Sequence, residues 1–169
     1  MLLVLTASVL LFGARLSSHS RLRTAAGGSE PAGSRAAKIV AQMTLEEKVS
    51  LLVGGPGNYS GNVAAIPRLG IPEQRGNDGP QGFNGLPGTQ TSFPSSLSVA
   101  ASWDTAMATK FGAACAVEFD AKGANIMLGP ALNVARVPLD GRNYEYLSGE
   151  DPALGAAMAA AVVTGVQSK

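Results

Sequence analysis

The segment from residue 54 to residue 96 constrains the fold of this 169-residue chain most strongly. Glycine and proline supply 16 of its 43 residues, a density that regular helix does not tolerate. The glycines follow no G-X-Y period, which excludes a collagen-like strand. A loop of this length inside a compact domain is usually functional or contains short strands. We expect a short strand over Glu73–Asn77, leading into a turn at Asp78-Gly79-Pro80.

Helix signals flank the glycine-rich segment. Thr44 and Glu47 form a T-x-x-E capping box, which predicts a helix from there to about Val53. Asp104 is a favourable N-cap for a second helix that ends near residues 122–123. Asp151, followed by proline in the first turn, begins a third helix. Its high alanine and glycine content predicts close packing against a sheet or another helix.

The run Ala124–Leu128 is apolar, short and closed by Gly129-Pro130. Between two helices, this pattern predicts a buried parallel strand. The order of elements is then helix, loop with a strand, helix, strand, loop, helix. That alternation favours the α/β fold class.

The N-terminal part has a different composition. Residues 1–18 contain a short apolar run typical of a signal peptide, which predicts secretion; a plain extension or an incorrect gene start are the alternatives. Residues 19–37 are rich in Ser, Ala, Gly and Arg and predict a flexible linker. The folded domain is expected to cover residues 38–169.

The overall composition excludes several function classes. With 13 basic and 12 acidic residues and no basic stripe, the chain has no electrostatic basis for binding nucleic acid. No run reaches the roughly 18 apolar residues that a membrane-spanning helix needs. Cys115 and His19 are the only cysteine and histidine, so we expect no metal site and no Ser-His-Asp or Cys-His chemistry. Chemistry would have to rest on carboxylates, Arg, Lys or Tyr.

Two loops follow the expected strands, NDGPQGF from residue 77 and DGRNYEYLSGEDP from residue 140. Loops at the carboxyl ends of parallel strands build the active sites of α/β folds. Asp78 can accept two sugar hydroxyls, and Arg142 offers a planar fork of donors. Each also has an ordinary structural interpretation: Asp78 as part of a plain turn, and Arg142 in a surface ion pair. Tyr144 and Tyr146 either line a sugar site or pack within the loop.

Glycoside hydrolysis normally needs a pair of carboxylates. Spacing alone does not show which carboxylates face one sugar, and Asp151 is most simply a helix cap. The candidates are Asp78, Asp140, Glu145, Glu150 and Asp151.

Several motifs, in order and at characteristic spacing, resemble the N-terminal domain of family 3 glycoside hydrolases, the β-glucosidase and β-xylosidase group. The resemblance covers residues 43–167, about three quarters of the chain. The matching motifs are MTLEEKVSLL (43–52), IPRLGIP (66–72), NDGPQGF (77–83), FPSSLSVAASWD (93–104) and the continuous stretch 123–167.

This resemblance implies a fold and a function. The fold would be the N-terminal portion of a (β/α)₈ TIM-type barrel, incomplete in this chain because a full barrel takes about 250 residues. The reaction would be retaining hydrolysis of O-glycosidic bonds in β-glucosides, with β-xylosides as the alternative, through a covalent intermediate on an aspartate and without a cofactor. Asp78 and Arg142 match family residues that bind the sugar in the innermost subsite. The partner would be a β-glucoside or oligosaccharide substrate.

Three departures from the family pattern matter. The Ser-Asp-Trp-like motif of the nucleophile, the Lys-His sugar-binding pair and the acid/base glutamate do not occur in this chain, so we expect no catalytic residue among its 169 residues. Asn84 stands where the family often has an arginine. We therefore expect a fragment of a larger hydrolase, inactive alone, marginally stable and prone to aggregate without its C-terminal part. The alternatives are a non-catalytic truncated relative with weak sugar binding, or an unrelated α/β binding protein.

Overall fold

The computed structural model describes residues 31–169, and the chain divides between residues 41 and 42 into two units. Helix α2 (Ala32–Gln42) lies at this division and buries none of its residues. It begins inside the segment for which a flexible linker was expected, because its alanines and long basic side chains are good helix formers. The expected signal peptide at residues 1–18 lies outside the described residues and stays a prediction.

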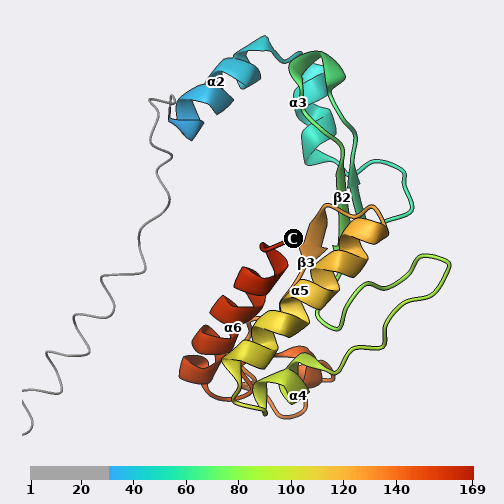
Figure 1. The fold of residues 1–169 in the computed structure, drawn as a ribbon. Coiled ribbons are helices and arrows are strands. Elements are labelled where there is room, and N and C mark those ends of the chain that lie inside the picture. Colours follow the sequence, from blue (N-terminus) through green and yellow to red (C-terminus); the bar gives the residue numbers. More distant parts are fainter. Residues whose placement is uncertain (1–30) are drawn as a thin grey trace, which may run out of the picture. The chain divides into compact units, whose positions relative to one another are not determined.

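The second unit is a mixed α/β domain (Figure 1). Its helices and strands confirm most of the expected order and add elements that the sequence did not reveal. The elements are α3 (Leu45–Leu52), β1 (Gly61–Val63), η1 (Pro67–Leu69, a 3₁₀ turn), β2 (Gln74–Asp78), α4 (Ser96–Ala100), α5 (Thr105–Ala121), β3 (Ile126–Leu128), η2 (Asn143–Glu145, a 3₁₀ turn) and α6 (Pro152–Val166).

The predicted helix caps are confirmed. The backbone N–H of Glu47 donates to the hydroxyl oxygen of Thr44 at 3.2 Å, and the N–H of Thr44 donates to the Glu47 carboxylate at 2.9 Å. Asp104 and Asp151 each accept two backbone N–H groups from the first turns of α5 and α6. These bonds satisfy donors that a helix start leaves without intrahelical partners, which is why the sequence located the starts correctly.

The sheet has three strands in the order β1-β2-β3, and it does not close into a barrel among the described residues. Strand β2 pairs antiparallel with β1 and parallel with β3, and Asp78 lies opposite Leu128 at the end of the parallel ladder. The parallel arrangement of β3 was predicted, but its burial was wrong. Ile126 is 38% exposed and Leu128 47%, because β3 is an edge strand among residues 31–169.

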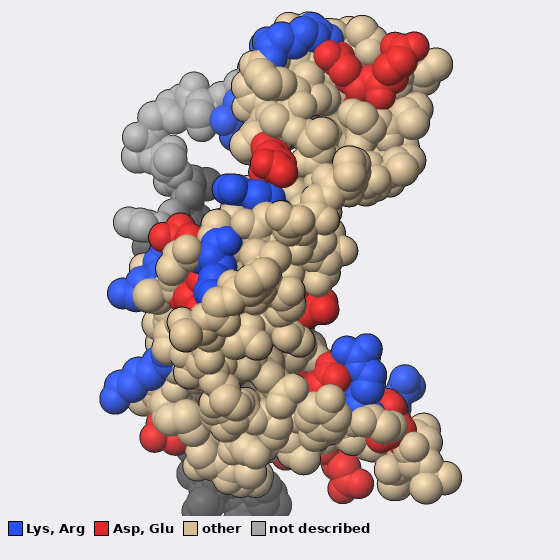
Figure 2. Space-filling model, turned by 90° about the vertical axis from the view of Figure 1, so that its right-hand side faces the viewer, with Lys and Arg blue, Asp and Glu red and all other residues tan. Residues whose placement is uncertain are grey.

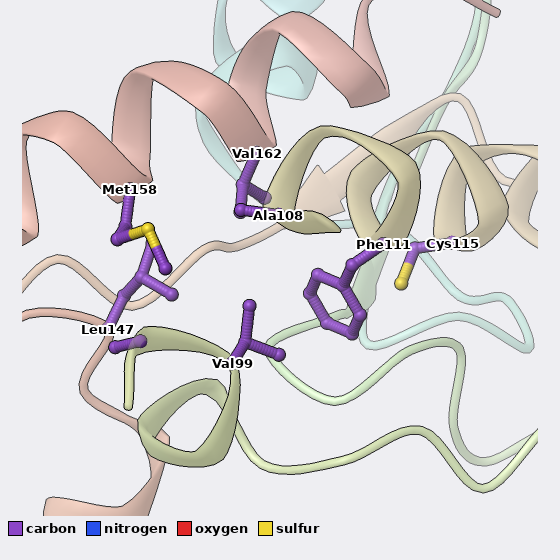
Figure 3. Close-up of a cluster of buried hydrophobic side chains, with 8 residues drawn as sticks. Val99, Ala108, Phe111, Cys115, Leu147, Met158 and Val162 are labelled. Atoms are coloured by element: carbon purple, nitrogen blue, oxygen red, sulfur yellow. The ribbon is translucent and has the colours of Figure 1, made fainter. Parts of the chain in front are cut away.

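The core lies between α5 and α6, which run side by side (Figure 1). Glycines allow their close approach, since a Cβ at Gly112 would overlap the backbone at Val162 and one at Gly165 would overlap the backbone at Thr109. This confirms the predicted close packing of the last helix. Figure 3 shows the side chains of this cluster: Val99, Ala108, Phe111, Cys115, Leu147, Met158 and Val162.

Burial in this cluster determines the protonation state of the Cys115 thiol. Cys115 is fully buried, and desolvation, followed by the negative charge of Glu118, raises the pKa of its thiol to about 12. The thiolate is therefore scarce near neutral pH, and Cys115 acts as a small apolar core residue.

The described part of the chain has neither a strongly charged patch on the face drawn in Figure 2 nor a helix suited to crossing a membrane. Charged side chains of both signs are scattered over the face in Figure 2, and neither sign forms a continuous patch there. Between residues 31 and 169, every helix is too short or too polar to cross a membrane.

Candidate functional site

A cavity of about 1150 Å³ opens where β2 and β3 end. Because the two strands are parallel and end in register, their carboxyl ends lie at the same edge of the sheet. The residues that follow β2 form one wall, and those that follow β3 form another. Residues 78–84, 90–93, 128–131, 133, 142 and 144–146 line the cavity. Asp78 and Arg142, the two predicted site residues, therefore lie in one cavity although 64 positions separate them in the sequence (142 − 78).

Asp78 is the last residue of β2, and its side chain is exposed. The backbone directly after it is fixed, because the N–H of Gly79 donates to the carbonyl of Leu128 at 3.2 Å. One carboxylate oxygen, Oδ2, accepts the hydroxyl of Ser60 at 3.2 Å. Asp78 thus presents an acceptor-only group to the cavity from a rigid strand end.

Asn77, the neighbour of Asp78 in β2, holds the backbone around the cavity in place. It was not predicted as a site residue. Its side chain is 2% exposed, accepts the backbone N–H of Ser60 at 3.3 Å and donates to the carbonyl of Asn84. It therefore ties the segment before β1 to the cavity loop after β2. The sequence signal that could have identified Asn77 is the alternation of side chains along a strand. Because Asp78 is exposed, its neighbour Asn77 lies on the opposite, buried face of the sheet.

Arg142 is held by Glu145 in a bidentate ion pair. Its Nε donates to Oε1 at 2.8 Å and its Nη2 donates to Oε2 at 2.6 Å. The side chain of Arg142 is 71% exposed, whereas that of Glu145 is only 10% exposed. The hydrogen bonds raise the pKa of Arg142 and hold the pKa of Glu145 below its ordinary value. The ion-pair interpretation of Arg142 is therefore confirmed, and it is compatible with a place in the cavity wall.

Asp140 and Tyr146 make a second pair in the same loop. The Tyr146 hydroxyl donates to Oδ2 of Asp140 at 2.7 Å, and the backbone N–H of Arg142 donates to Oδ1 at 3.1 Å. The hydrogen bond to Tyr146 lowers the pKa of Asp140, and the same bond raises the pKa of Tyr146. Both carboxylate oxygens of Asp140 are thus engaged in holding the loop.

The structure also shows where the remaining candidate residues from the sequence lie. Asp151 caps α6, as its simpler interpretation predicted. Tyr144 and Tyr146 both line the cavity, and Tyr144 is 46% exposed. Glu150 is exposed and lies outside the cavity lining. In the part of the chain from residue 31 onward, no cluster of three or more His, Cys, Asp or Glu side chains is arranged to hold a metal ion.

The cavity therefore combines a carboxylate that only accepts hydrogen bonds with a guanidinium that only donates them, beside two tyrosines. Neutral hydroxyl groups satisfy both partners at once, because each hydroxyl donates and accepts. A concave site with a few convergent polar groups is typical of small-molecule binding. The fold and the site thus define a mixed α/β domain with a cavity suited to a polyhydroxylated ligand.

Comparisons with known proteins identify the family of this domain. Residues 58–169 match the family model for the glycosyl hydrolase family 3 N terminal domain. A probable β-glucosidase M from Aspergillus fumigatus is 44% identical over 150 residues, which cover 86% of this chain and 19% of that protein. Thermostable β-glucosidase B from Acetivibrio thermocellus is 41% identical over 145 residues, covering 78% of this chain and 18% of that protein.

Solved structures give the same result. A β-glucosidase from Streptomyces venezuelae in complex with D-glucose matches 79% of this chain and 17% of its own, with 39% identity and a TM-score of 0.74. β-Glucosidase 3B from Thermotoga neapolitana in complex with glucose matches 79% and 21%, with 36% identity and a TM-score of 0.71. The chain belongs to glycosyl hydrolase family 3. It spans about a fifth of the length of the relatives that it matches.

Proposed function

We propose that this chain supplies the sugar-binding part of a β-glucosidase-like hydrolase, with Asp78 and Arg142 binding hydroxyls of the terminal sugar. The observation that carries the proposal is that both residues line the same cavity. Support comes from two relatives that were solved in complex with glucose. The proposed ligand is a β-glucoside or a short oligosaccharide, and the proposed fold of the complete domain is a (β/α)₈ barrel.

The chemistry of bond cleavage is proposed to need groups outside residues 31–169. A retaining mechanism takes one carboxylate as nucleophile and a second as acid and base. In the loop of residues 140–146, Asp140 and Glu145 each have both carboxylate oxygens engaged in hydrogen bonds. Asp78 remains, and its place beside Ser60 at a strand end suits hydroxyl binding. The chain alone is therefore proposed to bind sugar without hydrolysing it.

Calorimetric titration of the chain with methyl β-D-glucoside tests the binding proposal. We expect weak saturable binding that Asp78→Asn reduces by about tenfold to a hundredfold, since a hydrogen bond to a charged group contributes about 1.5–3 kcal/mol. Asp120→Asn is the matched control, because Asp120 is exposed on α5 and outside the cavity. Equal affinity in wild type and Asp78→Asn would overturn the assignment of Asp78.

An assay with an aryl β-glucoside tests the second part of the proposal. We expect no turnover by the chain alone. Turnover that Asp78→Ala abolishes would show that a bond-breaking carboxylate lies within this chain, and the proposed division between binding and cleavage would then be wrong. Absence of both sugar binding and turnover would contradict a role of this chain in sugar recognition altogether.

A further inference from the structure

Arg142 is held by hydrogen bonds both at its backbone and at its guanidinium. Its backbone N–H donates to Asp140 at 3.1 Å, and its guanidinium donates to Glu145 through Nε and Nη2. Because both ends are held, the side chain has little freedom to turn away from the cavity that it lines. The side chain of Arg142 is 71% exposed, and an exposed ion pair alone holds a long side chain only weakly, so the second anchor at the backbone matters.

The bidentate pair also decides which donors of Arg142 remain for a ligand. A guanidinium has five N–H groups in a fixed planar fork. Two of them are directed at Glu145, one from Nε and one from Nη2. The three that remain are both N–H groups of Nη1 and the second of Nη2. Glu145 therefore takes one edge of the fork and leaves the other edge for contacts in the cavity.

Glu145 itself is firmly attached to the core. It is 8% exposed and ends η2, two residues before Leu147, which is completely buried. The backbone N–H of Leu147 donates to the carbonyl of Ala131 at 3.0 Å, so the loop is bonded to the wall of the cavity that follows β3. A carboxylate on this short, anchored turn defines the position of Arg142 relative to the rest of the site.

We propose that Glu145 is a positioning residue for sugar recognition, acting through Arg142 and not on the sugar itself. By binding one edge of the guanidinium, it directs the other edge into the cavity that also contains Asp78. The inference rests on the proposed function and deepens it. It also assigns a role to a carboxylate that sequence analysis had left among the acid/base candidates, because both oxygens of Glu145 are already occupied by Arg142.

A double-mutant cycle separates positioning from general structural support. The affinity for methyl β-D-glucoside is measured by titration of wild type, Glu145→Gln, Arg142→Ala and the double variant. We expect Glu145→Gln to weaken binding by about tenfold in the wild-type background, in line with the coupling usual for residues in contact. In the Arg142→Ala background the same substitution should have no effect. Equal weakening in both backgrounds, or none in wild type, would overturn the proposal.

A second readout does not depend on sugar. The Nε–H of Arg142 should exchange slowly with water in wild type and quickly in Glu145→Gln, as followed by nitrogen-15 NMR. Glu150→Gln, in the same loop but outside the cavity lining, is the control and should leave the exchange unchanged. If wild type binds no sugar, the proposed function fails, and this exchange still decides the positioning role. Equal exchange in wild type and Glu145→Gln would overturn that role.

Discussion

The pair of helices α5 and α6 and the three-stranded sheet are stabilised in different ways. Between the helices, Met158 and Val162 are completely buried, and two glycines bring the backbones into contact. On the sheet, Ile126 and Leu128 of β3 remain 38% and 47% exposed. The helix pair therefore gains its stability from close packing of apolar side chains, whereas the sheet depends mainly on its hydrogen-bonded ladders.

This difference bears on the site, which lies at the carboxyl edge of the sheet. Asp78 is the last residue of β2. Its carboxylate accepts a hydrogen bond from the hydroxyl of Ser60, and the backbone N–H of the next residue, Gly79, donates to the carbonyl of Leu128. The loop of Arg142 is joined to the helical core through Leu147. The two residues proposed to bind sugar thus come from regions of unequal packing. Substitutions in the core should therefore affect stability far more than substitutions on β3.

The largest expected effect follows removal of a core side chain. Met158→Ala should lower the free energy of unfolding by about 2–5 kcal/mol, because it leaves a cavity at a completely buried position. Leu128→Ala, on the exposed strand β3, should change it by only about 0.5 kcal/mol. Urea unfolding followed by circular dichroism measures both values. Similar losses for the two variants would show that the sheet is packed as firmly as the helix pair.

A smaller effect is expected from filling the helix contact. Gly165→Ala places a methyl group against the backbone of Thr109. The backbone of α5 can make room for this methyl group only if α5 moves away from α6. Overpacking of this kind should cost about 1–3 kcal/mol. Gly141→Ala is the matched control, since nothing lies within 4 Å of its added methyl group. The thermal midpoint should fall for Gly165→Ala only, and an unchanged midpoint would contradict the close contact.

The smallest effect concerns the bond between Tyr146 and Asp140. This bond lowers the pKa of Asp140, so its contribution is complete above the ordinary pKa of 3.8 and is lost as pH falls through the lowered value. It raises the pKa of Tyr146, so the contribution is complete below 10.0 and is lost as pH rises through the raised value.

Tyr146→Phe removes this hydrogen bond and leaves the ring in place. The thermal midpoint of the variant should lie slightly below that of wild type between about pH 4 and pH 10, and the two midpoints should converge outside this window. Calorimetric scans at a series of pH values measure the difference. A difference that persists unchanged at pH 2 would mean that the ring, and not the hydroxyl, distinguishes the two proteins.

The regular helices were predictable because their signals are local. Thr44, Asp104 and Asp151 act on backbone N–H groups two or three residues away, and the structure has all three caps. Strand β1 was missed because its three residues lie in the glycine-rich segment and have no alternating pattern. Helix α4 was missed because five residues carry no periodicity, although Ser95 caps it through Ser98.

The sequence selected candidate residues that share a cavity, but not the contacts that hold them there. Asp78 and Arg142 lie at or after strand ends and within family motifs, and both line one cavity in the structure. The pairing of Arg142 with Glu145 and the support from Asn77 depend on side-chain packing that spacing does not encode. The burial expected for β3 was wrong, because an apolar run indicates what a strand can cover, not whether a neighbour is there to cover it.

The central claim is that the sugar binds at the carboxyl edge of the sheet, between Asp78 and the loop of Arg142. Nitrogen-15 NMR of the chain, titrated with methyl β-D-glucoside, tests it most directly. We expect progressive shifts of the amide signals of residues 77–84 and 140–146, with those of α6 unchanged. Shifts confined to the helix pair, or saturable binding that leaves residues 77–84 unaffected, would contradict it.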